Sequence, residues 1–355
     1  MPSLNIGVVA STIGIAPTVT LNAASNFNQE LATLNATVDA NGYSTTVKFQ
    51  YSTASNFSTF TEVNAATTPI TGQAVSSYAN ITGLSTNTTY YFRCVATNAV
   101  GTTTSSSLSF TTWNIQVYER STSGGTTFTI PTVTPTGGSA VAVSILDIIM
   151  FGAGGGGGVG GGAGGGGYQS VSSRSMTGSR SITTSVGAGG VGGTSGMTNG
   201  GDTTLTGDLT TLTASGGAAS NDSAGLAGSS GNGNAGGSTA SYDPDGGGKG
   251  LPNFAYGGGG GAGGVGGNGV ANASTTTGGN GGTGVSVTLG GVTRAGGAGG
   301  GGSTFVPQPV GTTADGSVGS NNTYGSGGTA NFNAGGSAGQ AGYIRFRYYA
   351  ASALA

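Results

Sequence analysis

The chain has 355 residues, of which 78 are glycine and only 6% are charged. Nine Lys and Arg against eleven Asp and Glu leave no basic patch for contacts with phosphates, so we expect no nucleic-acid partner. There is no histidine and one cysteine, which excludes Cys/His zinc sites and an intrachain disulfide. No apolar run approaches the roughly 18 residues of a membrane span, so we expect no membrane insertion.

The glycines divide the chain into two parts. Residues 1–112 hold six of them and residues 113–355 hold the other 72. This change in composition predicts a domain boundary near Trp113. We predict an N-terminal arm over 1–16, a first domain over 17–112 and a glycine-rich domain over 113–355.

The first domain shows short bursts of alternating polar and apolar residues. Examples are "ATLNATVDA", "TVKFQYST" and "TYYFRCVATN", and turn clusters such as "DANG" and "STNT" separate them. Short period-2 segments between turn signals predict an antiparallel β-sandwich. Cys94 is in phase with Tyr90 and Phe92, so we expect it to be a small buried hydrophobic residue and not a reactive thiol.

One stretch of this domain, "ITGLSTNTTYYFRCVATNAVG", resembles strands E to F of fibronectin type III domains. The matching positions are Gly83, Leu84, Thr88, Tyr90, Arg93, Ala96, Asn98 and Gly101. The tryptophan common in strand B of animal modules is missing, and Leu34 is the nearest aliphatic candidate for its place. The resemblance covers about 95 residues and implies the sandwich fold; such modules are mostly spacers.

Strand-like segments also punctuate the glycine-rich domain. We predict strands in "TTFTIP", in the apolar run Ala140–Phe151, in "SRSITTSVGAGG" and in the closing "AGYIRFRYY". Two related segments predict hairpins, with Gly207-Asp208 and Gly290-Gly291 as the tight turns. The predicted fold class is therefore all-β for the whole chain.

The order of these pieces resembles the glycine-rich domain of bacteriophage tail-fibre and virion appendage proteins. Such domains start on an "FTVP"-like strand and end on a strand similar to "GYIRFRYY", and the resemblance spans about 124–349. It implies a virion protein with other virion proteins as partners. No basic segment precedes "NIGVVASTIGIA", so we expect no secretory signal peptide and predict assembly in the host cytoplasm.

The glycine runs need an external support, because glycine loses more backbone freedom on folding than any other residue. "FGAGGGGGVGGGAGGGGYQ" has thirteen glycines in nineteen residues. Such runs either pack side by side as polyglycine II-like helices of three residues per turn, or cross as extended loops between sheets. We favour loops on a β scaffold, because strand-like segments separate the runs.

The entropic cost of so many glycines also favours assembly. A monomer with one apolar strand offsets this cost poorly, so we expect a homo-oligomer, with a trimer as the first choice. We expect "VAVSILDIIMF" and "IRFRYY" to be buried between its chains.

The sequence offers little for catalysis. Gly335–Gly339 matches G-x-S-x-G, but without histidine a Ser-His-Asp triad cannot form. "GGGKG" around Lys249 lacks the Ser or Thr of a phosphate loop. Asp243 and Asp245 in "YDPDGGG" are more consistent with a turn than with a calcium site. We therefore predict no enzyme, no catalytic residue, no metal and no cofactor.

Aromatic residues beside the glycine runs are the candidate contact residues. The wider set also includes Tyr168 and Phe305, and these side chains serve either to meet a sugar or an outer-membrane protein, or to fill gaps that glycine leaves. Our candidates for receptor contact are Tyr242, Phe254, Tyr256, Tyr324 and Phe332.

These observations predict a non-enzymatic virion protein, a tail fibre or adhesin that contributes to attachment to a host-surface glycan or outer-membrane protein. The alternative is a capsid decoration or head-fibre protein without specific receptor binding. A surface-layer or matrix protein of a cell is a third hypothesis.

Overall fold

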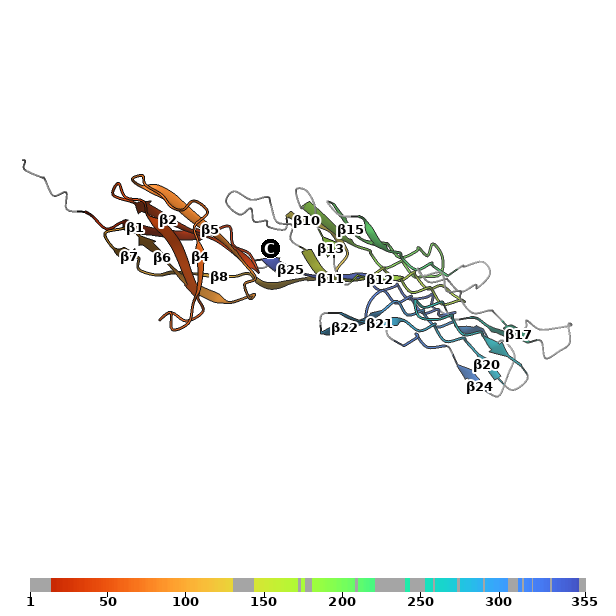
Figure 1. Ribbon diagram of the computed structural model, residues 1–355. Helices are drawn as coiled ribbons and strands as arrows, with labels where there is room; N and C mark the ends of the chain where they lie inside the picture. The colour runs from red at the N-terminus through yellow and green to blue at the C-terminus, as the bar shows by residue number, and fades with distance from the viewer. Residues whose placement is uncertain are drawn as a thin grey trace, which may run out of the picture. The chain divides into compact units, whose positions relative to one another are not determined.

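The computed structural model describes residues 14–129, 144–171, 174–175, 181–207, 210–220, 240–242, 253–257, 259–272, 275–289, 291–305, 312–314, 316–320, 322–332 and 334–350. These residues form strands and no helix, as the predicted all-β class requires (Figure 1). The chain divides into two compact units. The first takes in the described residues up to Ile115 together with Tyr349 and Ala350, and the second takes in those from Gln116 to Tyr348.

The first unit contains two antiparallel sheets. One has the order β1-β2-β5, and the other has the order β4-β3-β6-β7 with β8 also paired to β6. Their bounds are β1 Thr18–Ser25, β2 Leu31–Asp39, β3 Thr46–Ser52, β4 Thr61–Asn64, β5 Val75–Thr82, β6 Thr89–Thr97, β7 Thr102–Thr104 and β8 Leu108–Thr111.

Alternate residues of these strands form one hydrophobic core. Leu34, Phe49 and Phe92 are fully buried in it, so Leu34 contributes to the core in the absence of a tryptophan there. Cys94 is free and fully buried, as expected, and burial raises the pKa of its thiol to about 12. Tyr90, at the start of β6, accepts a hydrogen bond at its hydroxyl from the backbone N–H of Ser85 (3.0 Å).

The described residues of the second unit form five small sheets. Their orders are β12-β11-β25-β9 with β13 also on β11, β10-β14-β15-β16, β17-β18-β23, β19-β20-β24 and β21-β22. The bounds are β9 Asn114–Arg120, β10 Gly124–Thr129, β11 Ser144–Phe151, β12 Tyr168–Val171, β13 Arg174–Ser175, β14 Ser181–Val186, β15 Thr203–Gly207, β16 Leu212–Ala214, β17 Ala240–Tyr242, β18 Asn253–Ala255, β19 Val270–Ala271, β20 Thr275–Thr277, β21 Val285–Leu289, β22 Val292–Gly296, β23 Thr304–Phe305, β24 Thr312–Ala314 and β25 Tyr343–Ala350.

Both predicted hairpins form, but only the second has its predicted turn. β15 pairs with β16 with Leu205 opposite Leu212, and Gly207 ends β15 and pairs with Ile182 of β14, so the prediction of a two-residue turn at Gly207-Asp208 was wrong. β21 pairs with β22 through a two-residue connection in which Gly291 has a φ of +75°. The apolar strand β11 and the closing strand β25 pair antiparallel with each other in the same chain. Ile148–Phe151 and Tyr343–Ile344 are already fully buried there, so these strands do not need a second chain to cover them.

The glycine runs are packed side by side, which corrects our preference for extended loops. Residues 152–158 lie at the centre. Their N–H groups bond to three neighbouring segments, and every third residue bonds to the same one, at 2.8–3.0 Å: Gly152 to Gly167, Ala153 to Gly201, Gly154 to Gln340, Gly155 to Gly164, Gly156 to Thr198 and Gly157 to Ser337. This is the period of an extended helix with three residues per turn.

The carbonyl groups of 153–158 accept bonds from three further segments with the same period. The donors, at 2.8–3.2 Å, are Gly217 and Ser220, Gly190 and Gly193, and Gly328 and Asn331. Six neighbours therefore satisfy the backbone of one central segment without any β-ladder. We call the whole assembly the glycine lattice: 152–158, 160–167, 187–193, 198–201, 215–220, 259–264, 279–284, 297–303, 316–320, 324–331 and 335–342.

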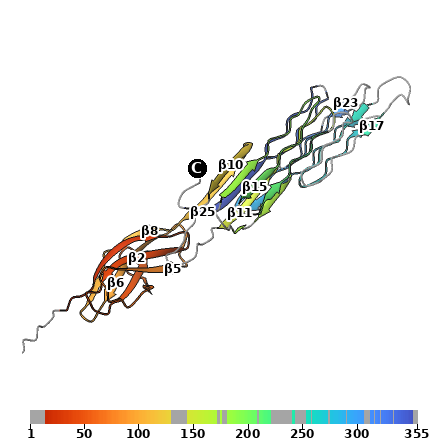
Figure 2. The ribbon, with the colours of Figure 1, turned by 90° about the horizontal axis from the view of Figure 1, so that it is seen from above.

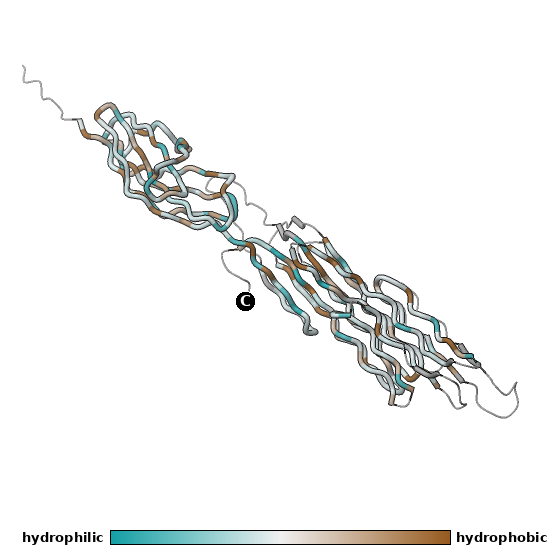
Figure 3. Tube along the Cα trace, turned by 90° about the horizontal axis from the view of Figure 1, so that it is seen from below, coloured by the Kyte–Doolittle hydropathy of each residue, from teal (hydrophilic) through white to brown (hydrophobic). Residues whose placement is uncertain are grey.

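Close approach explains why the lattice requires glycine. A Cβ added at Gly156 would overlap the carbonyl oxygen of Val191, and one at Gly154 would overlap that of Ser326. Figure 3 shows the extended segments of this unit as mostly neutral in hydropathy, with hydrophobic residues on only some of the strands. The loop prediction was wrong because the strand-like segments that interrupt the runs are short and let the runs return beside one another.

Candidate contact site

Four aromatic side chains from separate parts of the second unit form one cluster. Phe254 lies on β18, Tyr256 follows that strand, Phe305 lies on β23 and Phe332 follows the lattice segment 324–331. We call these four residues the aromatic cluster. In both ribbon views, β17 of this sheet lies at the end of the unit remote from β10 and β25, and Figure 2 shows β23 near it (Figures 1 and 2).

The four rings contact one another in a closed circuit. The ring centroids are 6.1 Å apart for Phe254 and Tyr256, 6.5 Å for Phe254 and Phe305, 6.3 Å for Tyr256 and Phe332, and 4.4 Å for Phe305 and Phe332. The planes of these pairs are inclined by only 16–33°. Near-parallel offset rings are a favourable arrangement, so the cluster holds its own shape.

The backbone beneath the rings belongs to the lattice or to its edge. Phe254 and Phe305 are opposite each other in the pairing of β18 with β23. The N–H of Tyr256 donates to the carbonyl of Ser303 (3.0 Å), and its own carbonyl accepts from Gly279 (2.8 Å). Just before Phe332, the N–H of Asn331 donates to the carbonyl of Gly158 (3.1 Å). The rings are therefore positioned by main-chain bonds.

All four side chains of the aromatic cluster are half-buried. Burial raises the pKa of the Tyr256 phenol, so this side chain is neutral at physiological pH. The cluster thus presents an uncharged aromatic surface that remains partly open to solvent. Such a surface suits contact with the apolar face of a sugar or with a protein loop.

The structure brings together three of the five candidates predicted from the sequence: Phe254, Tyr256 and Phe332. Phe305 belonged to the wider set of aromatics and joins them through strand pairing. Tyr242 lies on β17, paired with Asn253, but its side chain lies outside the described residues. Tyr324 lies elsewhere, stacked on Tyr343 at 4.1 Å.

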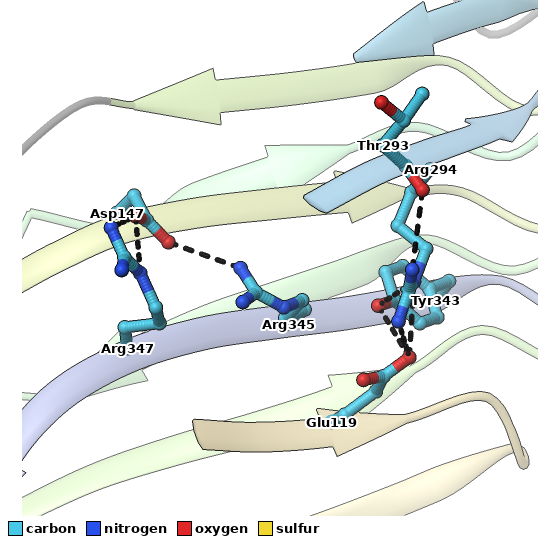
Figure 4. A network of polar contacts seen from close by, with 7 residues as sticks. All are labelled: Glu119, Asp147, Thr293, Arg294, Tyr343, Arg345 and Arg347. Atoms are coloured by element: carbon cyan, nitrogen blue, oxygen red, sulfur yellow. Dashed lines mark hydrogen bonds and ion pairs between the residues drawn. The ribbon is translucent and has the colours of Figure 1, made fainter. Parts of the chain in front are cut away.

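The stack of Tyr324 belongs to a hydrophobic cluster that also contains Phe151, Ile149 and Val287. A polar network lies next to it (Figure 4). Glu119 on β9 accepts hydrogen bonds from the Tyr343 hydroxyl on β25 (2.7 Å) and from Arg294 on β22 (2.8 Å). Burial opposes ionisation of Glu119, but these hydrogen bonds and the positive charges of Arg294 and Arg345 outweigh it and lower its pKa.

A second ionic group lies on the same strand β25. Asp147 on β11 accepts hydrogen bonds from Arg345 (3.2 Å) and from Nε of Arg347 (2.7 Å), as Figure 4 shows. Asp147 and Arg345 are each only 3% exposed. A buried carboxylate held by two guanidinium groups fixes the register of β25 against β11, and we assign both networks to structure.

Side chains that could catalyse a reaction or bind a metal ion are scarce among the described residues. No three His, Cys, Asp or Glu side chains converge there on a site for a metal ion. The hydroxyl of Ser337, in the G-x-S-x-G match, accepts a bond from the N–H of Thr329 (2.9 Å) within the lattice. Asp243, Asp245 and Lys249 lie outside the described residues. The described residues also include no helix long and apolar enough to cross a membrane.

Comparison with known proteins places the second unit in a family. Residues 121–349 match the family described as "Glycine-rich domain", and the chain belongs to this family. No curated protein matches the sequence.

Two solved structures of the sensor domain of the anti-sigma factor RsgI4 from Pseudobacteroides cellulosolvens are similar to part of the chain. The first is a solution structure with 21% identity and a TM-score of 0.22, and it covers 27% of this chain and 74% of that one. The second is a shorter form with 21% identity and a TM-score of 0.23, covering 28% and 97%.

Proposed function

We propose that the protein is a non-enzymatic structural protein of a bacteriophage virion, a tail fibre or adhesin that contributes to attachment to the host surface. The aromatic cluster carries this proposal. It is an uncharged, partly exposed surface that three separate segments build on a lattice held by main-chain hydrogen bonds. Such a pre-organised surface binds a partner with a smaller ordering cost than a flexible one.

The two units have different roles in this proposal. The first is a fibronectin type III-like module that acts as a spacer or dock, and residues 1–16 are the arm that joins other virion proteins. Its strand orders, β1-β2-β5 and β4-β3-β6-β7, support this assignment. The bond between Tyr90 and Ser85 is the tyrosine corner found in such sandwiches, which also supports it.

A binding experiment tests the attachment role. The labelled full-length protein is incubated with a panel of bacterial strains, beside a Phe254→Ser/Tyr256→Ser variant. We expect saturable binding to some strains only, and at least tenfold weaker binding by the variant. The matched control is Val265→Ser, which removes a side chain 65% exposed on the same unit but outside the cluster, and it should bind normally.

Two other outcomes of this experiment would support the alternatives. Normal binding by the double variant would show that the aromatic cluster only fills space. If the folded protein binds no strain but binds phage capsids, the protein is a decoration or head-fibre protein. The homo-oligomer, with a trimer expected, is measured independently by light scattering of the full chain.

A further inference from the structure

The first unit has a small pocket where β3 ends and where β4 and β6 begin. It measures about 240 Å³, and the aromatic rings of Tyr51, Phe60 and Tyr90 line it. Tyr51 and Tyr90 lie 6.2 Å apart with their planes inclined by 58°, so they form two walls at an angle. Phe60 is 48% exposed at the rim, so its side chain is open to a ligand from solvent.

The remaining lining is made of hydroxyl groups. Thr53, Thr59 and Thr61 are exposed around the pocket, and among the described residues their hydroxyls have no hydrogen-bond partner. The hydroxyl of Ser52 is instead used to close the loop between β3 and β4. It donates to the carbonyl of Thr59 (2.6 Å) and accepts from the N–H of Ala54 (2.9 Å). No charged side chain lines the pocket.

The loop that carries Phe60 is held in one conformation. Phe57 has a φ of +53°, a strained value for a bulky residue, and such strain is often kept where a site needs it. The Arg93 guanidinium lies over the Phe57 ring, 4.3 Å from its centroid, and 5.8 Å from that of Phe60. Nε of Arg93 donates to Gln50 (2.8 Å), which fixes the guanidinium in turn.

We propose that this pocket binds one neutral sugar ring of a glycan. Its volume is below the roughly 300–1,000 Å³ of pockets for drug-sized ligands, which favours a single ring. The aromatic walls suit the C–H face of a pyranose, and the free threonine hydroxyls suit its hydroxyl groups. The absence of a lining charge favours a neutral sugar over an acidic one. This site is separate from the aromatic cluster of the second unit.

The test uses the full-length protein and a panel of methyl glycosides: glucoside, galactoside, mannoside and N-acetylglucosaminide. Binding is measured by saturation-transfer NMR and by titration. We expect at least one glycoside to bind, and Phe60→Ser to weaken it at least tenfold while Phe60→Tyr retains it. Thr59→Val/Thr61→Val keeps the shape, removes two hydroxyls and should weaken binding similarly.

Val100→Ser is the matched control, because it replaces an apolar side chain that is 43% exposed on the same unit but outside the pocket, and it should leave glycoside binding unchanged. Because the comparison of Phe60 variants concerns the first unit alone, its result is distinguishable from a failure of attachment through the aromatic cluster. Lack of binding by every glycoside at millimolar concentration would overturn the proposal. So would equal binding by Phe60→Ser, with its melting temperature unchanged.

Discussion

At the scale of single residues, side-chain oxygens accept hydrogen bonds from backbone N–H groups at the edge of the glycine lattice, where no further segment supplies a carbonyl group. The Asn199 side chain accepts from the N–H of Ala219, and Asp202, three residues later, accepts from Gly216, both at 2.8 Å. Asn280 accepts from the N–H of Ser317 (2.9 Å) in the same way. Backbone groups at an edge need partners as much as those inside, so Asn and Asp among the glycines end the lattice.

Inside the lattice, a single methyl group should be destabilising. In Gly156→Ala, the added Cβ would overlap the carbonyl of Val191, and the segment can relieve this only by moving away from its neighbours. We expect a loss of about 1–3 kcal/mol or more, as for overpacked cores. Calorimetry of the full chain measures it as a lower melting temperature.

Gly264→Ala is the control for this prediction. The added Cβ there meets only the Thr283 side chain, which can rotate away, and the backbone of Thr283 at 3.8 Å. An equal loss in both variants would show that the effect comes from glycine content and not from close packing.

The hydroxyl group of Tyr90 contributes to the stability of the first unit. Tyr90→Phe removes the acceptor of the Ser85 N–H, so this side chain no longer ties β6 to the turn before it. We expect a loss of about 0.5–1.5 kcal/mol in the free energy of unfolding. Tyr91→Phe, at the next residue on the other face of β6, is the control, and denaturant titration of both variants should show a loss only for Tyr90→Phe.

At the scale of elements, two ionic groups tie the strand β25 to three others. Arg345 pairs with Asp147 on β11, and the Tyr343 hydroxyl bonds to Glu119 of β9, which pairs with Arg294 of β22. In the second unit these ionic groups lie on neighbouring strands, whereas other strands of the same unit carry cross-strand hydroxyl pairs such as Thr127 with Thr183 (2.7 Å). The charges therefore specify how the sheet of β25 is assembled.

The Glu119 network predicts a dependence on pH. Because its pKa is lowered in the folded state, ionised Glu119 contributes stability above the ordinary carboxyl pKa of about 4.3, and this contribution is lost as the pH falls through the lowered value. We expect the second unit to lose stability below about pH 4. Glu119→Gln should flatten this part of the profile of melting temperature against pH.

Glu62→Gln serves as the comparison. Glu62 pairs with Lys48 in the first unit, so its replacement should leave the acid profile of the second unit as it was. A profile that is unchanged in Glu119→Gln would mean that other carboxylates cause the acid sensitivity.

The elements also show what sequence can predict. The strands β11 and β25 and the strand pairs of both hairpins were predictable because strand-like apolar segments are local signals. The turn predicted at Gly207 was wrong because this residue pairs with Ile182 of β14, a neighbour that the local sequence does not reveal. The glycine lattice could not be predicted, because the glycines of a run are identical and the local sequence does not indicate which segment packs beside them. Phe254 and Phe332 could be singled out as aromatics among glycines, but their contact through Tyr256 and Phe305 depends on that long-range packing.

At the scale of the whole molecule, stability comes from two different interiors. The first unit buries apolar side chains, whereas the second pairs backbone groups over long sequence separations, such as Gly154 with Gln340. Hydrogen exchange distinguishes them. We expect the N–H groups of 153–157 to exchange as slowly as those of β2 and β6, although they belong to no β-ladder.

Amide exchange followed by NMR tests this directly. The N–H of Val265, a residue 65% exposed at the lattice edge, provides the fast reference in the same unit. Exchange of 153–157 at the rate of Val265 would contradict the lattice.

The three-residue period has a consequence for how such a chain can change in length. Each neighbour of 152–158 bonds to every third residue. Inserting or deleting three residues in a run therefore moves the chain by one full turn and returns each remaining residue to the same partner segment. A change of one or two residues turns every donor toward the wrong segment. Related chains should therefore differ in the length of their glycine runs by multiples of three residues, because only such changes keep every hydrogen bond directed at its original partner segment.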